Sequence, residues 1–170
     1  MLNGKPMAEI HSIKETKFIA DAMLGKLSKW LRILGFDTLY YRNKEDDKLL
    51  ELALSENRLI LTRKTSLKGR KDIKHQLLFI IDNDPLKQLK EVIEHYNLTI
   101  DAHNVFTLCI ICNQKLETFP AELAKDRVPE YVANTEKAFF ICPHCKKIFW
   151  RGTHYQNMWK KIKATINPQP

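Results

Sequence analysis

Apolar residues over the first hundred positions fall into two alternating patterns: short dense runs, and longer stretches with a spacing of three or four residues. The short runs predict strands, which lie at residues 17–20, 37–41, 58–62 and 76–81. The longer stretches predict amphipathic helices, which lie at residues 22–34, 46–56 and 84–96. This alternation predicts an α/β fold with a parallel central sheet, because each helix carries the chain back to the same edge of the sheet.

Turn and cap residues support these limits. Gly35 follows the first helix, where a glycine often takes the left-handed conformation that ends a helix. Asp84 and Pro85 form the pair expected at a helix start, with the aspartate as N-cap and the proline as the first helical residue. The third and fourth predicted strands are apolar at almost every position, which indicates that both faces of the sheet are covered.

The only cysteines are two Cys-x-x-Cys pairs, Cys109/Cys112 and Cys142/Cys145. This spacing turns both sulfurs of a pair toward one metal ion, so the two pairs predict a zinc ribbon with four thiolate ligands. Two disulfides are the alternative, but the sequence does not open with a charged and then apolar export segment, which favours reduced thiols. Four thiolates fill the coordination sphere, so we expect a structural zinc and not a catalytic one.

A chain of 170 residues suits one ordinary domain with a small added module. We expect a flexible leader over 1–16, an α/β domain over 17–103, the zinc ribbon over 104–152, and a basic C-terminal helix with its tail over 153–170. No apolar run approaches the roughly 20 residues that span a bilayer. We therefore expect a cytoplasmic protein with no membrane partner.

The charge of the chain indicates a polyanionic partner. The formal net charge is +8 with a pI near 9.3, which favours RNA or DNA. Lys26, Lys29 and Arg32 recur on one side of the first helix and are candidates to follow a phosphate backbone, although a solvated helix face is the ordinary alternative. Arg63 ends the third strand, where it suits either a phosphate or a structural ion pair.

Three aspartates stand where predicted strands give way to helices. Asp21 follows the first strand, and Asp46 and Asp47 open the second helix. Ligands of open α/β sheets sit beyond the carboxyl ends of the strands, where these side chains are expected to converge. Carboxylates there suit Mg²⁺ or Mn²⁺, which can activate water to attack a phosphodiester. Helix capping is the alternative, since an aspartate before a helix commonly satisfies its free N–H groups.

Several motifs in combination carry a family resemblance. They are Asp-Ala-Met-Leu-Gly-Lys-Leu from Asp21, Asp46-x-x-Leu, Leu-Thr-Arg at 61–63, both cysteine pairs, and Trp-x-Gly-Thr-His at 150–154. With them, the chain resembles the ribonuclease-like domain named after the C-terminus of the mutator-seven exonuclease. The resemblance implies a PIN-like three-layer α/β nuclease fold carrying a zinc ribbon. It also implies an RNA substrate, with Asp21 and Asp46 as catalytic acids and Asp47 as an adjacent alternative.

The chain departs from the family pattern at Lys64. The pattern has an aspartate after Leu-Thr-Arg, so the lysine exchanges a carboxylate for a cation that repels a divalent metal but can hold a phosphate as a point charge. Two functions stay open. In the one that we favour, the protein is a Mg²⁺- or Mn²⁺-dependent ribonuclease, which Lys64 impairs unless Asp82 or Asp84 replaces the missing acid. In the other, it is a non-catalytic RNA- or ribosome-associated adaptor.

Overall fold

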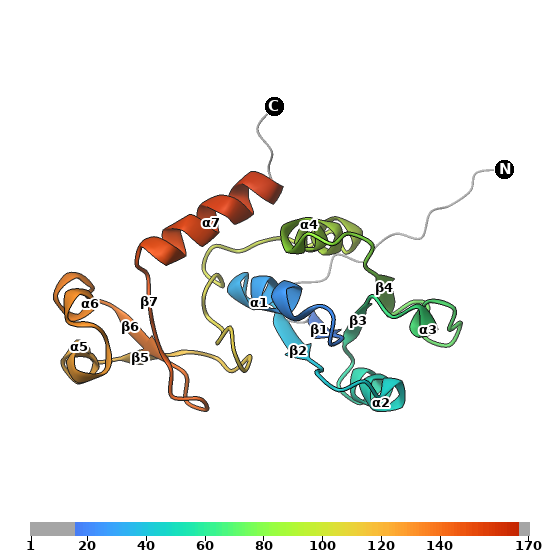
Figure 1. The fold of residues 1–170 in the computed structure, drawn as a ribbon, viewed down its shortest axis with the longest axis horizontal. Coiled ribbons are helices and arrows are strands. Elements are labelled where there is room, and N and C mark those ends of the chain that lie inside the picture. Colours follow the sequence, from blue (N-terminus) through green and yellow to red (C-terminus); the bar gives the residue numbers. More distant parts are fainter. Residues whose placement is uncertain (1–15, 167–170) are drawn as a thin grey trace.

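The structure is a computed structural model that describes residues 16–166. The predicted leader, apart from Thr16, and residues 167–170 lie outside the described residues. Four strands form one parallel sheet in the order β2-β1-β3-β4: β1 (Lys17–Ala20), β2 (Asp37–Tyr40), β3 (Leu59–Thr62) and β4 (Leu77–Phe79). The predicted α/β fold with a parallel sheet is confirmed, and β1 and β2 are direct neighbours (Figure 1).

Helices cover both faces of this sheet. They are α1 (Gly25–Ile33), α2 (Asp46–Ser55), the short α3 (Thr65–Lys68) and α4 (Pro85–His95). Successive strand residues point to opposite faces, so Phe18 joins the core beneath α1 and α4 while Ile19 joins the core beneath α2. All three layers are therefore closed by apolar contacts, each fully buried large side chain contributing roughly 1.5–3 kcal/mol.

The ends of the helices show which local signals the sequence carries. α1 begins at Gly25, three residues later than predicted, because the N–H of Met23 donates to the side chain of Asp21 (2.7 Å) in a turn before the helix. Gly35 has φ +88°, and a Cβ there would lie 2.4 Å from the carbonyl oxygen of Asn104. Asp84 caps α4 through its Oδ1, as predicted.

The second half of the chain forms a small antiparallel sheet and a returning helix. The sheet has the order β5-β6-β7, from β5 (Glu117–Phe119), β6 (Phe139–Ile141) and β7 (Ile148–Trp150). Three short helical segments join β5 to β6: α5 (Ala121–Ala124), η1 (Lys125–Arg127) and α6 (Glu130–Thr135).

The last described helix, α7 (Thr153–Ile166), begins at the residue predicted as the start of the basic C-terminal helix. It runs back over the α/β domain beside α4 (Figure 1), and Ile162 is fully buried in the core that α1 and α4 share. A helix with many lysines is thus also part of the main core. Within the described residues, no helix is long and apolar enough to cross a membrane.

Candidate functional site

The four cysteines lie in one cluster near the edge of the α/β domain. All four Sγ atoms lie within 4.8 Å of one another, with 3.6 Å between Cys109 and Cys145 and 3.3 Å between Cys112 and Cys142. Four sulfurs at about 2.3 Å from a tetrahedral zinc are about 3.8 Å apart, so the cluster suits a zinc ion. The sulfurs are free thiols and far beyond disulfide bonding distance. Burial raises the pKa of Cys109 to about 12, so a thiolate there needs a neighbouring cation.

The two Cys-x-x-Cys loops have the same backbone geometry. In each, the N–H of the first cysteine donates to the carbonyl five residues later, and its carbonyl accepts from the N–H four residues later. That fourth residue is in the left-handed region in both loops, Asn113 with φ 69° and Lys146 with φ 60°. The local sequence therefore folds each pair into a ready-made half of the zinc site.

The first loop is joined to the parallel sheet by side-chain hydrogen bonds. The side chain of Asn113 accepts from the N–H of Thr38 on edge strand β2 (2.9 Å) and donates to Asp37 (2.6 Å). The buried guanidinium of Arg32 donates to the carbonyls of Ile110 and Ile111 within the loop, both at 3.0 Å. Arg32 thus has a structural role besides the RNA contact predicted for it, and its positive charge lies beside the thiols.

The carboxyl end of the sheet carries a second cluster, the acid rim, made of Asp21, Asp46 and Lys64. Asp21 is fully buried. Its Oδ2 accepts from the hydroxyl of Thr62 (2.5 Å) and from the N–H of Arg63 (2.7 Å), while Oδ1 accepts from the N–H of Met23. Both oxygens of this carboxylate are therefore already hydrogen-bonded within the protein.

The other half of the rim is an ion pair. Lys64 Nζ lies 2.6 Å from Asp46 Oδ1, and the hydroxyl of Ser66 donates to Asp46 Oδ2 (2.8 Å). The hydrogen bond from Lys64 lowers the pKa of Asp46 below its ordinary value. Lys64 also donates to the carbonyl of Lys44 (3.0 Å), so its ammonium is fixed in place.

Helix capping does not account for these aspartates. The N-cap of α1 is Leu24 and that of α2 is Glu45, and neither uses a side-chain cap. Asp21 serves the turn between β1 and α1, and Asp46 is the first residue of α2.

A divalent metal does not fit the rim as it stands. Mg²⁺ and Mn²⁺ need several free oxygen ligands, and here a lysine ammonium and hydrogen-bond donors already hold the carboxylates. Asp82 and Asp84 supply no replacement, because Asp84 caps α4 and Asp82 accepts from the N–H of Asp84 (2.8 Å). Across residues 16–166, the four cysteines are the only group of three or more His, Cys, Asp or Glu side chains placed to share a metal.

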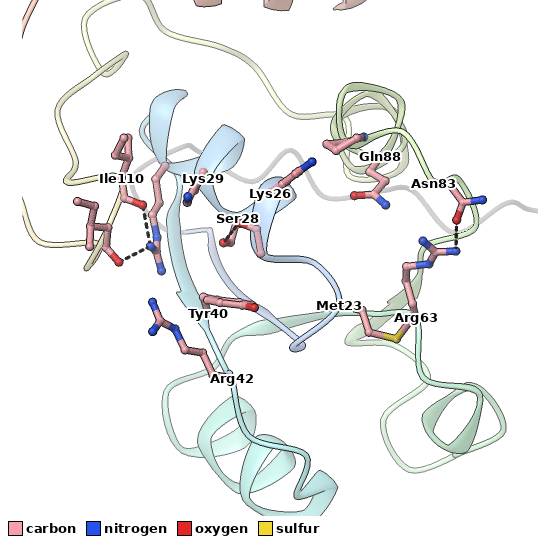
Figure 2. A pocket seen from close by; sticks show the side chains of 14 residues that line it. Met23, Lys26, Ser28, Lys29, Tyr40, Arg42, Arg63, Asn83, Gln88 and Ile110 are labelled. Atoms are coloured by element: carbon pink, nitrogen blue, oxygen red, sulfur yellow. Dashed lines mark hydrogen bonds between the residues drawn. The ribbon is translucent and has the colours of Figure 1, made fainter.

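A basic cleft of about 500 Å³ lies beside the rim, between α1, the end of β2 and the start of α4. Figure 2 shows its side chains, and the charged ones among the described residues are all cations: Lys26, Lys29, Arg32, Arg42 and Arg63. Lys26 and Lys29 are exposed and pair with no carboxylate in the described part of the chain, while Arg63 donates to Asn83 (2.6 Å). The cleft brings together four cations that the sequence singles out.

Arg42 is the cation of this cleft that sequence reasoning missed. Its guanidinium lies over the ring of Tyr40, 5.6 Å from the ring centroid. The available signal was its place just after the second predicted strand, at the edge of the sheet where ligands gather.

Comparison with known protein families shows to which family the chain belongs. Residues 16–162 match the family described as the Mut7-C RNAse domain. The chain belongs to this family. Membership confirms the resemblance carried by the motifs, and it supports a ribonuclease-like protein with RNA as partner. A comparison with curated proteins finds no match.

Proposed function

We propose that this member of the Mut7-C RNAse domain family binds single-stranded RNA along the basic cleft without cleaving it efficiently. The observation that carries the proposal is the Lys64–Asp46 ion pair at 2.6 Å beside a cleft whose charged lining is entirely cationic. The first feature disfavours a divalent metal, and the second favours phosphate groups.

Several features of the cleft suit a phosphate backbone. Lysines act as point charges and arginines as planar forks with several donors, so a mixed set contacts phosphates without reading sequence. Gly25 opens α1 at the wall of the cleft, and a Cβ there would lie 2.9 Å from the Tyr40 ring. The absent side chain lets the Tyr40 ring pack against the start of α1, and this ring and the helix together form one wall of the cleft.

Hydrolysis of RNA by this fold would need a divalent ion held by Asp21 and Asp46 or Asp47. Such an ion would have to displace the ammonium of Lys64 from Asp46 and two donors from one oxygen of Asp21. A divalent ion near a fixed ammonium is repelled, and the remaining oxygens are too few for its usual coordination. These contacts support a binding protein over an efficient nuclease.

The test is a binding titration with single-stranded RNA at several salt concentrations. Lys26→Glu/Lys29→Glu should weaken binding at least about tenfold and reduce the salt slope by about 1.4, the contribution of two phosphate contacts. Lys71→Glu/Lys74→Glu is the matched control, because it makes the same charge change in the segment before β4 and outside the cleft. If both double variants weaken RNA binding equally, or if binding does not depend on salt concentration, RNA does not bind along the basic cleft.

A nuclease assay with Mg²⁺ and Mn²⁺ tests the second half of the proposal. We expect the wild-type chain to leave RNA intact over times in which an active ribonuclease degrades it. Rapid cleavage that Asp21→Asn abolishes would instead establish metal-dependent hydrolysis, and the Lys64–Asp46 pair would then have to open during the reaction.

A further inference from the structure

A second cavity, of about 440 Å³, lies in the ribbon half of the molecule between α6, the β6–β7 hairpin and the first turn of α7. We call it the aromatic pocket, because six aromatic side chains line it: Phe106, Tyr131, Phe140, Phe149, Trp150 and Tyr155. The Trp-x-Gly-Thr-His motif contributes all five of its residues, 150–154, to the wall. This motif has no place in the acid rim or the basic cleft.

Two of the rings lie next to the cation Arg151. The guanidinium of Arg151 lies 5.8 Å from the ring centroid of Phe140 and 5.5 Å from that of Tyr155. The rings of Tyr155 and Phe106 are 4.1 Å apart. Tyr131 lines the pocket with 77% of its surface exposed, so its ring is available to a ligand.

A glycine in the motif allows two of the lining groups to come close. A Cβ at Gly152 would lie 3.0 Å from Trp150 Nε1 and 3.4 Å from Glu136 Oε1. Without that methyl group, the edge of the Trp150 indole and the Glu136 carboxylate both approach the backbone at Gly152. Aromatic rings beside a carboxylate acceptor suit a flat ligand with N–H donors at its edge, which is the chemistry of a nucleobase.

The pocket neighbours the proposed RNA path, because Ile110 lines both the basic cleft and the aromatic pocket. We propose that the aromatic pocket takes one unstacked base of the RNA strand whose backbone follows the basic cleft. Tyr131 and Trp150 stack on the base, and Glu136 accepts from its N–H edge. This inference rests on the proposed function, and it adds a base-binding subsite to a phosphate-binding one.

A nucleobase fits these residues better than an apolar peptide segment does. Arg151, His154 and Glu136 place charge or hydrogen-bonding groups in the lining, where a purely apolar side chain would leave them unpaired. Arginine planes and aromatic rings are the surfaces on which unstacked bases rest in single-strand binding proteins. The net charge of +8 favours the polyanion as well.

The test compares an ordinary single-stranded RNA with a strand of equal length that carries abasic residues. Tyr131→Ala should weaken binding of the ordinary strand about 5- to 150-fold, the range for loss of one stacked base, and leave the abasic strand unaffected. Its salt slope should stay that of wild type, because no phosphate contact is lost. Tyr131→Phe keeps the ring and should bind as wild type does. Leu123→Ala, at another exposed apolar side chain outside the pocket, is the matched control.

Gly152→Ala provides a second variant, since its methyl group would push Trp150 and Glu136 apart. It should also weaken binding of the ordinary strand only. The inference is overturned if Tyr131→Ala and Gly152→Ala bind RNA as wild type does, or weaken both strands equally. If both variants instead lose only a protein ligand, the pocket is a peptide site. Salt-dependent binding through Lys26 and Lys29 with no effect at Tyr131 refutes the subsite and leaves the proposed function standing, whereas no RNA binding at all refutes both.

Discussion

The four-cysteine cluster and the acid rim both gather ligands for a metal ion, and they differ in what already surrounds those ligands. The sulfurs of the cluster lie 3.3–3.6 Å from each other in two pairs, and the buried cation Arg32 interacts with two of them, Cys109 and Cys112. The carboxylates of the rim lie against a lysine ammonium, two hydroxyl groups and backbone N–H groups. The cysteine cluster can therefore accept a metal ion, whereas the carboxylates of the acid rim already have a cation and hydrogen-bond donors as partners.

This difference shows that the residue types at a site predict metal binding less well than whether their ligand atoms already accept hydrogen bonds or ion pairs. The two aspartates expected to act as family acids, Asp21 and Asp46, are present, but Lys64 supplies the positive charge that a metal would bring. The internal ion pair satisfies the Asp46 carboxylate within the fold. Binding of RNA and loss of metal chemistry are therefore compatible within one structure.

We expect the largest effect from a substitution that removes one ligand of the cysteine cluster. Cys112→Ser should lower the bound zinc from one ion per chain and unfold the ribbon, because metal binding and folding are coupled and zinc contributes about 10–16 kcal/mol in zinc-finger peptides. Much of the parallel sheet should stay folded, since its strands are buried in two apolar cores built mainly with α1, α2 and α4. Elemental analysis and circular dichroism measure both results. His144→Ala, between two ligands of the second loop, is the control and should keep its zinc. Wild type that contains no zinc when purified without chelator contradicts the cluster.

We expect the next largest effect from a substitution that makes the acid rim able to bind a metal ion, as the cysteine cluster is expected to do. Lys64→Asp removes the ammonium and adds an oxygen ligand, so affinity for Mn²⁺ should rise about ten- to hundredfold. RNA cleavage should appear with it, and Asp21→Asn on the same background should abolish both gains. Lys64→Met removes only the charge and should give a smaller rise. A metal titration and a nuclease assay follow the series. An equal affinity for Mn²⁺ in wild type and Lys64→Asp would show that the lysine does not exclude the metal.

The sequence is a good guide to features that depend on local pattern. The strands and longer helices of the α/β domain follow from the apolar spacing, and the cap at Asp84 and the turn at Gly35 follow from single residues. The four cysteines are predictable because paired thiols have few other uses. The three helical segments between β5 and β6 are three to six residues long, too short for a helical period to show.

Contacts between distant residues explain what the sequence does not reveal. The bond from Arg32 to Ile110 joins positions 78 apart, and nothing near Arg32 marks it as a partner of the cysteine loop. The pairing of Lys64 with Asp46 depends likewise on how α2 is placed against the end of β3. In α7, the lysines at 160, 161 and 163 suggest a solvated helix, although Ile162 among them is fully buried.

A smaller effect should distinguish the two cysteine loops, because the first is hydrogen-bonded to the parallel sheet through Asn113. Asn113 and Lys146 hold the same left-handed position, so replacing either by glycine relieves the same backbone conformation. Lys146→Gly should change the free energy of unfolding by less than about 1 kcal/mol. Asn113→Gly should lower it by about 1–3 kcal/mol, because the bonds to Thr38 and Asp37 are lost. Urea unfolding of the zinc-loaded protein measures the difference. Equal effects at the two positions would show that the first loop is not anchored through Asn113.

The smallest expected effect is the pH dependence of the Lys64–Asp46 pair. Lys64 lowers the folded-state pKa of Asp46, so the pair stabilises the fold above the ordinary aspartate pKa of about 3.9 and loses that contribution as the pH falls through the lower folded-state value. Asp46→Asn should therefore cost stability at neutral pH and progressively less in acid, by under about 1 kcal/mol in total because the pair is partly exposed. Urea unfolding at several pH values measures this dependence, with Asp47→Asn as the control for charge alone. Lys64→Met should raise the pKa of Asp46 toward its ordinary value in a carboxyl NMR titration. A pKa that does not move would show that the lysine ammonium does not control this carboxylate.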